Sequence, residues 1–470
     1  MDPISAALAR MPEGCVVTDP DIIASRTLDF RKLYQGAARA LLRPASVEEV
    51  QAIVRICAEE GIPLVPQGGN TGYCTAATPD AGGAELIVSL ERMSRLREID
   101  PANLSLSADA GAILSDLQRA AEDAGLMLPL ALGSQASCRI GGNLSTNAGG
   151  IQVLRYGMAR AIVLGIEVVL PDGSLVSEMA PLRKNNAGYD VKQLFIGAEG
   201  TLGIITGVSL ALVRQPRQVV TAMLAVEDIT RLPELLARAQ GHSGEQITSF
   251  EYVSRASLDL LLSSHAELAH PLPGDAAHYI LMEAATASPV PWLEDAMTAL
   301  LGEMIEEGAV TDGIIATSGQ QRTSLWHLRE NIPEGEVRHG GSVKHDVAVR
   351  CSRVAEFIEA ARDLVTRLCP EARQSIYGHV GDGNVHFNLL APQGVDPKAF
   401  KARIEAELSP AIHQLAVDMG GTFSAEYGIG RVKMDMLRQF GHPGKRDLMG
   451  RIKRAIDPQG LMNPGKVVVD

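Results

Sequence analysis

Three glycine-rich segments in the first half of the chain constrain its fold more than any other feature. They are Gln67-Gly-Gly-Asn-Thr-Gly72, the long segment from Leu132 to Gly150, and Ile196-Gly-Ala-Glu-Gly-Thr-Leu-Gly203. Glycine lets consecutive backbone N–H groups converge on an anion that a Cβ would block. None of the segments has the pattern of a Rossmann dinucleotide site or of a P-loop. The glycines therefore predict an anion-binding domain of another kind.

The residues around these loops predict both helices and strands. In residues 43–70, Ser46 caps a helix, Glu49 completes a capping box and Gly61 ends the helix, after which a short strand leads into the first loop. Pro171-Asp-Gly-Ser174 predicts a hairpin turn between two apolar runs. The N-terminal half is therefore α+β rather than doubly wound.

Composition narrows the function classes. A chain of 470 residues predicts two or three domains. The formal net charge of −13 argues against general affinity for nucleic acid or anionic membranes. The six cysteines form no C-x-x-C pair, so iron–sulfur and cysteine–zinc sites are not expected. We expect the cysteines to be free thiols in a reducing cytoplasm. Neither a signal peptide nor a membrane-spanning run is recognisable.

The glycine-rich character ends near Arg214-Gln-Pro216, where we place a domain boundary. Beyond it, apolar periodicity predicts strands at 219–226 and 279–283 and a helix at 292–306. The expected domains are therefore 1–215, 216–422 and a C-terminal segment, 423–470.

The segment Tyr377-Gly-His-Val-Gly-Asp-Gly-Asn-Val-His-Phe-Asn388 predicts a β-hairpin with the Asp-Gly pair 382–383 as a two-residue turn. That turn would place His379 opposite His386 on one face, together with the first and last residues of the segment. With a carboxylate such as Glu426 downstream, the two imidazoles suit zinc or a similar divalent metal. The alternative is a hairpin that merely happens to be rich in histidine.

The glycine-rich segments, in this order and with the terminal Leu461-Met-Asn-Pro-Gly-Lys466, resemble the FAD-binding signatures of the vanillyl-alcohol oxidase / p-cresol methylhydroxylase superfamily. The resemblance covers nearly the whole chain and is greatest to the D-2-hydroxyacid dehydrogenase branch, which includes D-lactate and D-2-hydroxyglutarate dehydrogenases. It implies an α+β fold: a non-Rossmann FAD-binding domain of the p-cresol methylhydroxylase type, an α+β substrate cap domain, and a short C-terminal segment that returns to the FAD domain.

The resemblance also implies the cofactor site. Some relatives attach FAD through a His in the first loop, where this chain has Asn70 and Thr71, so FAD is expected without a covalent bond. The residues expected to bind it are Gln67, Gly68, Gly69, Asn70, Thr71, Gly72, Gly133, Ser134, Gly141, Gly142, Asn143, Thr146, Asn147, Gly149, Gly150, Glu199, Gly200, Ile205 and Asn463.

In the C-terminal half, the resemblance implies that His379, His386 and Glu426 bind a metal, usually zinc. It implies that Arg329 and Lys344 bind a substrate carboxylate, although an Arg on a helix is by itself more often a surface charge. Asn388 is expected to form a hydrogen bond with the substrate.

The chain departs from the family at two positions. Tyr427 replaces the His often proposed as catalytic base, so we expect Tyr427 to act only as a hydrogen-bond partner. Pro333 replaces a Thr that helps to hold a distal carboxylate, which weakens the case for hydroxyglutarate.

The activity that the resemblance implies is oxidation of a D-2-hydroxy acid, first D-2-hydroxyglutarate, to the 2-oxo acid. Hydride would pass to flavin N5 while the metal polarises the hydroxyl. A soluble acceptor such as electron-transfer flavoprotein would take the electrons, with oxygen left open. The alternatives are D-lactate or another short D-2-hydroxy acid as substrate, a metal-independent flavin oxidase, and a non-catalytic flavin-binding subunit. A homodimer is the oligomer that we expect if the chain associates.

Overall fold

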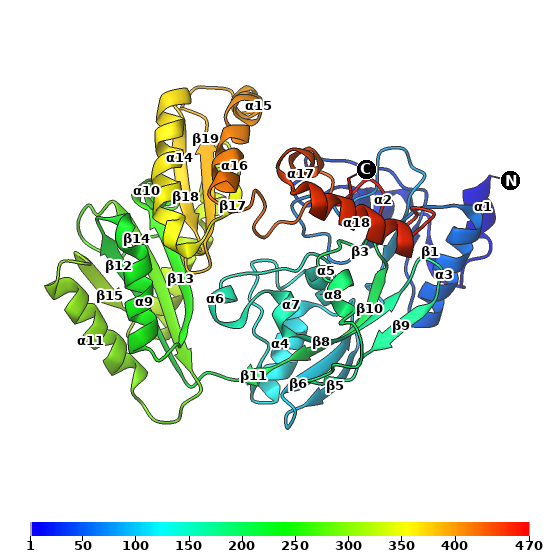
Figure 1. The fold of residues 1–470 in the computed structure, drawn as a ribbon, viewed down its shortest axis with the longest axis horizontal. Coiled ribbons are helices and arrows are strands. Elements are labelled where there is room, and N and C mark those ends of the chain that lie inside the picture. Colours follow the sequence, from blue (N-terminus) through cyan, green and yellow to red (C-terminus); the bar gives the residue numbers. More distant parts are fainter. Residues whose placement is uncertain (1, 470) are drawn as a thin grey trace. The chain divides into compact units, whose positions relative to one another are not determined.

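The computed structural model describes residues 2–469, which fold into two compact units, each built from segments distant in the sequence. The first unit contains Met1–Gly150, Gly157–Gln215 and Glu426–Asp470, and the second contains Ile151–Tyr156 and Pro216–Ala425. A stretch of six residues, Ile151–Tyr156, thus leaves the first unit and returns to it. Figure 1 follows this path in colour from the N-terminus to the C-terminus.

Two main sheets build the first unit. The smaller has the order β1 (Val16–Val17), β2 (Leu41–Leu42), β4 (Leu86–Ser89), β3 (Leu64–Gln67), with β4 parallel to both β2 and β3. The larger is antiparallel, in the order β5 (Leu96–Asp100), β6 (Ser105–Asp109), β10 (Ile204–Ala211), β8 (Val163–Val169), β9 (Leu175–Glu178). A separate pair joins β7 (Leu126–Met127) to β11 (Val213–Arg214). The predicted turn at 171–174 does connect two strands, β8 and β9.

The helices of the first unit are mostly short: α1 (Pro3–Leu8), α2 (Pro20–Thr27), α3 (Val47–Glu60), α4 (Leu114–Asp123), α5 (Ile140–Ser145), α7 (Ala159–Ile162), α8 (Lys192–Phe195), α17 (Met434–Phe440) and α18 (Pro443–Ile456). Helix α3 begins as predicted, because the Ser46 side chain accepts from the Glu49 N–H at 3.3 Å. It ends at Gly61, whose φ of +67° glycine adopts without strain. Helix α5 lies inside the second glycine-rich segment, which is therefore ordered.

An antiparallel sheet forms the centre of the second unit. Its order is β15 (Asp312–Ile315), β12 (Gln218–Val226), β14 (His278–Thr286), β13 (Ile247–Ser254), β18 (Arg373–Gly378), β19 (Asn384–Leu390), β16 (Ser342–Val343), and β17 (Asp346–Ala348) also pairs with β19. The helices are α6 (Val153–Tyr156), α9 (Leu232–His242), α10 (Arg255–Ser264), α11 (Leu293–Glu306), α12 (Gly319–Glu330), α13 (Ile332–Arg338), α14 (Val354–Leu368), α15 (Pro397–Glu407) and α16 (Ser409–Asp418).

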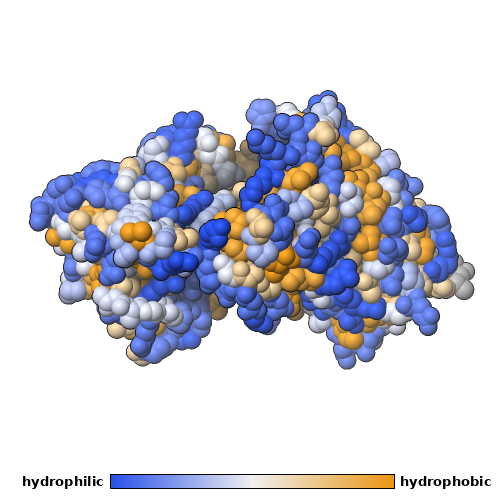
Figure 2. Space-filling view, turned by 90° about the horizontal axis from the view of Figure 1, so that it is seen from below, coloured by the Kyte–Doolittle hydropathy of each residue, from blue (hydrophilic) through white to orange (hydrophobic). Residues whose placement is uncertain are grey.

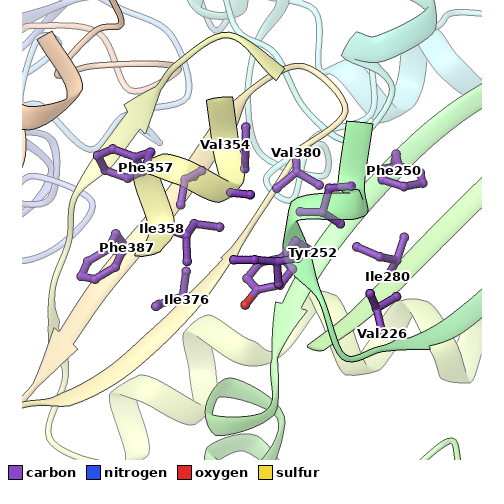
Figure 3. Close-up of a cluster of buried hydrophobic side chains, with 14 of the residues drawn as sticks. Val226, Phe250, Tyr252, Ile280, Val354, Phe357, Ile358, Ile376, Val380 and Phe387 are labelled. Atoms are coloured by element: carbon purple, nitrogen blue, oxygen red, sulfur yellow. The ribbon is translucent and has the colours of Figure 1, made fainter. Parts of the chain in front are cut away.

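Helices cover both faces of this sheet. Buried side chains of α9, α11, α14 and α16 pack with one face, and side chains of α10 and α12 pack with the other. In Figure 3, Phe357 and Ile358 of α14 lie with Ile376 and Phe387 of the neighbouring strands β18 and β19. Sheet and helices together confirm the predicted α+β class.

None of the helices between residues 2 and 469 has the length and apolar character needed to cross a bilayer. On the face drawn in Figure 2, hydrophobic residues are interspersed with hydrophilic ones.

Candidate functional site

The glycine-rich segments of the first unit line two adjoining cavities. Residues of all three segments contribute to the walls, and several of them line both cavities, which therefore form one groove: Gly68, Ala76, Ala77, Gly142, Thr146 and Glu199.

The groove walls consist largely of backbone. A Cβ at Gly68 would lie 3.3 Å from the Cα of Gly142, so the first and second glycine-rich segments touch through their main chains. A Cβ at Gly69 would lie 2.3 Å from the carbonyl oxygen of Ser137, which excludes any side chain there unless the backbone moves. Exposed main-chain amides between small residues are suited to a diphosphate, so the groove fits FAD.

Most of the residues predicted to bind the cofactor line this groove: Gln67, Gly68, Gly69, Asn70, Thr71, Gly72, Gly141, Gly142, Asn143, Thr146, Glu199, Gly200 and Ile205. The others are absent from its lining: Gly133, Ser134, Asn147, Gly149, Gly150 and Asn463. Asn463 instead binds two residues that line the groove: its Nδ2 donates to Ala76 O at 2.9 Å and to Glu199 O at 2.7 Å. Direct contacts of all these residues with FAD stay a prediction.

Glu199 ties the third glycine-rich segment to the C-terminal segment. Its two carboxylate oxygens accept from the N–H groups of Ile429, at 2.8 Å, and Gly430, at 2.9 Å. Burial raises the pKa of Glu199 to about 7, although these hydrogen bonds and the charges of Lys433 and Lys466 act in the opposite direction. Both carboxylate oxygens of Glu199 are thus used in hydrogen bonds within the protein, although the residue lines the groove.

Tyr427 lies in the groove lining together with the first glycine-rich segment. Its ring meets that of Tyr73 edge-on, with centroids 4.8 Å apart and an interplanar angle of 83°. The ammonium nitrogen of Lys433 lies 5.5 Å from the centroid of the Tyr427 ring. The residue that replaces the family His therefore contacts both Tyr73 and Lys433 through its aromatic ring.

In the second unit, the predicted hairpin is present but its turn is longer than expected. Strands β18 and β19 pair with Tyr377 opposite His386, which leaves residues 379–383 as the connection. The predicted two-residue turn, with His379 opposite His386, is wrong. The neighbouring strand β13 competes for the loop, because the Gly381 N–H donates to Phe250 O at 3.0 Å. The register moves by two residues, so the alternation of faces is unchanged.

The loop 379–383, which we call the metal loop, is fixed at both ends. The Val380 side chain is buried in the core, where Figure 3 shows it near Val354. Gly383 has a φ of +90°, and a Cβ there would lie 2.0 Å from Val349 O, so only glycine fits. Glycine is thus required at position 383, as the sequence predicts, but the turn is not the predicted two-residue type.

The structure brings the three predicted metal ligands together. The ligand atoms of His379, His386 and Glu426 all lie within 4.8 Å of one another. Glu426 directly follows Ala425, the last residue of the second unit, whose N–H donates to Asp346 O at 3.2 Å. Two imidazole nitrogens and one carboxylate oxygen are the donor set of many catalytic zinc sites, which keep one position open. The donors fit a divalent metal, and its binding stays a prediction.

The buried side chain of Glu251 on β13 contacts one of the three predicted ligands, His379. It is 1% exposed, and Oε1 lies 2.8 Å from Nδ1 of His379, while Oε2 accepts from Nε of Arg329 at 2.9 Å. Burial opposes ionisation, but the positive charges and hydrogen bonds of His379 and Arg329 lower the pKa of Glu251. An ionised Glu251 makes Nδ1 the donor and leaves the lone pair of Nε2 available to a metal.

A second buried carboxylate, Glu336 on α13, organises the residues predicted to bind substrate. It accepts from Nζ of Lys344 at 3.0 Å and from Nδ2 of Asn388 at 2.9 Å. Because a carboxylate only accepts, the amide of Asn388 must turn its nitrogen to Glu336, and its buried Oδ1 has no hydrogen-bond partner among the described residues. Arg329 stacks over Tyr377, with 4.8 Å from the guanidinium carbon to the ring centroid.

Sequence reasoning missed both carboxylates. Glu251 has a recognisable signal, since it interrupts the apolar run of a buried strand between Phe250 and Tyr252, and a buried charge there needs a partner. Glu336 has none, because Ile332–Arg338 reads as an ordinary polar helix.

Two family models together match most of the chain. The model of a FAD binding domain matches residues 38–177, and that of the FAD linked oxidases, C-terminal domain, matches residues 215–467. A mitochondrial D-2-hydroxyglutarate dehydrogenase of Danio rerio is 37% identical over 459 residues, which cover 97% of this chain and 83% of that protein. A D-2-hydroxyglutarate dehydrogenase of Stutzerimonas stutzeri is 36% identical over 454 residues, covering 97% and 96%.

Among solved structures, p-cresol methylhydroxylase with substrate bound is similar with a TM-score of 0.76 at 18% identity, over 100% of this chain and 97% of that chain. At this identity the likeness concerns the fold alone, and it confirms the predicted non-Rossmann type of FAD-binding domain. The relatives confirm the branch that the glycine-rich segments resemble. By its two matched domains and these relatives, the chain belongs to the family of FAD-linked oxidases.

Proposed function

We propose that this protein is an FAD-dependent dehydrogenase that oxidises a D-2-hydroxy acid to the 2-oxo acid, with D-2-hydroxyglutarate as first choice. The names of the relatives support this substrate. The observation that carries the proposal is the group His379, His386 and Glu426, whose ligand atoms lie within 4.8 Å of one another. The buried carboxylate of Glu251 links His379 of this group to Arg329. FAD, when bound in the groove, supplies the acceptor for the hydride from C2 of the substrate.

The residues of the second unit have distinct roles in this proposal. His379, His386 and Glu426 hold a divalent ion such as zinc, which supplies Lewis acidity toward the substrate hydroxyl. Arg329 and Lys344 orient the carboxylate ends of the substrate, and Asn388 accepts a hydrogen bond through Oδ1. Arg329 is already paired with Glu251 and Lys344 with Glu336, so these four groups together carry no net charge. The two cations therefore orient the substrate through directed hydrogen bonds rather than through an excess of positive charge.

Position 333 bears on whether the substrate carries a distal carboxylate. The Thr that helps relatives to hold a distal carboxylate is Pro333 in this chain, in the first turn of α13, and proline has neither a hydroxyl nor an N–H to offer. D-lactate or another short D-2-hydroxy acid is therefore the alternative substrate. Tyr427 serves as a hydrogen-bond partner, and the hydroxyl proton leaves to water.

We also propose that the electrons pass to a soluble acceptor such as electron-transfer flavoprotein. A homodimer and a cytoplasmic location stay predictions, and the second has no support from relatives that are named mitochondrial.

The test is anaerobic reduction of the flavin in the purified protein. D-2-hydroxyglutarate, D-lactate and both L-enantiomers are added separately, before and after treatment with a chelator and after return of zinc. Bleaching by a D-acid that the chelator abolishes and zinc restores is the expected result. Bleaching that resists the chelator would instead identify a metal-independent flavin oxidase. A flavin that no hydroxy acid bleaches would refute the proposed activity.

A further inference from the structure

The six residues Ile151–Tyr156, which we call the strap, belong to the second unit although the chain on both sides belongs to the first. Four hydrogen bonds anchor the strap at one end of β13 and on the neighbouring strand β14, one of them from Arg155 to the side chain of Gln246. Ser249 Oγ donates to Ile151 O, and the guanidinium of Arg155 donates to Gln246 O at 3.2 Å and to Ala285 O. These hydrogen bonds fix the strap at a defined position on the second unit.

Leu154 of the strap packs directly on the metal loop. A Cβ at Gly381 would lie 2.9 Å from Cδ2 of Leu154 and 3.0 Å from Cβ of Phe250, so Gly381 is enclosed between these two residues. Gly381 lies between the two histidine ligands in sequence. The packing of Leu154 therefore limits where the backbone that carries His379 can move.

The same region of β13 fixes the rest of the metal loop. Phe250 O accepts from the Gly381 N–H, and Glu251 binds the ring of His379. Cys351 Sγ donates to Gly381 O at 3.2 Å from another direction. The strap thus completes a set of contacts that hold one short loop, and it is the only member of this set that continues directly into a glycine-rich segment.

Upstream of the strap, the chain lines the proposed cofactor groove. Thr146 borders both cavities, and Gly150 immediately precedes Ile151. Gly150 is itself confined, because a Cβ there would lie 1.9 Å from Ala131 O. A cofactor that contacts Thr146 therefore touches the chain five residues before the strap begins at Ile151, with few residues in between to absorb a change.

We propose that the strap couples cofactor binding to metal binding, with Leu154 as the positioning residue for the metal loop. The inference rests on the proposed function, because it assumes FAD in the groove and a metal at His379, His386 and Glu426. Coupling of this kind is reciprocal: FAD strengthens zinc binding by the same factor by which zinc strengthens FAD binding.

The experiment measures zinc affinity in the full-length protein by competition with a chromogenic chelator, with FAD bound and after its removal. In the wild type, FAD should lower the Kd for zinc on the order of ten-fold, within the usual range of coupling between sites. In Leu154→Ala, this ratio should fall to about one, because the strap no longer presses on the metal loop. The affinity for FAD, with and without zinc, should change by the same ratio.

Leu364→Ala is the matched control. Leu364 is, like Leu154, a partly buried leucine at the edge of the same core. It lies on α14, outside the strap, so its truncation should lower stability comparably but leave the FAD-dependent ratio intact.

A second pair of variants tests the contact itself. Gly381→Ala adds a methyl group against Leu154 and should weaken zinc binding, and the same change should cost less in the Leu154→Ala background, where space has been made.

Three outcomes would overturn the inference. If the FAD-dependent ratio is unchanged in Leu154→Ala, Leu154 has no role in the coupling. If FAD does not alter zinc affinity in the wild type, there is no coupling, while the proposed function stands. A wild type that binds no zinc removes the metal part of the proposed function and the strap inference with it.

Discussion

Glu251 joins His379 to Arg329 through its two carboxylate oxygens, at 2.8 Å and 2.9 Å, in a position only 1% exposed. Glu251→Gln removes the charge that fixes the His379 tautomer, so we expect zinc affinity to fall about 10–100-fold. It also leaves Arg329 buried without a counter-charge, which should lower the free energy of unfolding by about 3–5 kcal/mol. Zinc competition and urea denaturation measure the two effects.

The control for this prediction is Glu303→Gln, which breaks an ion pair with Arg238 in which Glu303 is 49% exposed. That change should cost less than about 1 kcal/mol and leave zinc binding alone. Equal losses in both variants would show that Glu251 has no special role.

Glu336→Gln should act on substrate binding rather than on the metal. A Gln amide presents an N–H toward either Lys344 or Asn388, so one of the two loses its acceptor and its orientation. We expect KM for the D-2-hydroxy acid to rise about ten-fold, consistent with a lost charge-assisted hydrogen bond, while zinc affinity stays the same. Glu334→Gln, on the same helix but 52% exposed, should leave steady-state kinetics unchanged. A fall in kcat with constant KM would contradict this role.

Gly69→Ala should impair flavin retention. The added methyl group would lie 2.3 Å from Ser137 O and 2.9 Å from the Cα of Cys138, so the two glycine-rich segments must separate. We expect FAD affinity to fall by at least about ten-fold, or about 1.4 kcal/mol. Flavin-to-protein absorbance after gel filtration measures it. Gly302→Ala on α11, which lies outside the groove lining and meets nothing within 4 Å, should retain its flavin.

Glu199 should make the stability of the flavin-free protein depend on pH. Its folded-state pKa of about 7 lies above the usual value of 4.5, so the folded state holds the proton more tightly than the unfolded state. The resulting stabilisation is fully present below pH 4.5 and is lost as the pH rises to about 7. The loss amounts to about 3 kcal/mol. Urea denaturation across this range should show a smaller decline for Glu199→Gln than for the wild type, and parallel declines would disprove the assignment.

Tyr427→Phe should retain substantial turnover. Phenylalanine preserves the edge-on contact with Tyr73 and the ring near Lys433, and removes only the hydroxyl, which we expect to act as a hydrogen-bond partner and not as the base. Anaerobic flavin reduction in single-turnover mode measures the step. Near-complete loss of reduction would show that the Tyr427 hydroxyl takes part in proton transfer.

Much of this protein is readable from local sequence. Ser46 and Gly61 predict the ends of α3 because capping involves neighbours within one helical turn. The glycine-rich segments predict the groove because only glycine allows main chains to approach as closely as Gly68 and Gly142 do. The closeness of His379 and His386 follows from their mirrored spacing, even though the predicted turn between them is wrong.

The tertiary structure decided what depends on partners distant in sequence. The metal loop takes its length from β13, whose Phe250 O binds Gly381, and a local turn preference could not anticipate that competing acceptor. The pairing of Arg329 with Glu251 arises because two elements far apart in the chain bury both charges at one place, where neither is stable alone. Sequence by itself determined the donor groups and the glycine-lined walls. Only the fold decided which buried carboxylates hold those donors and that Leu154 rests on the metal loop, because these contacts arise from packing between distant segments.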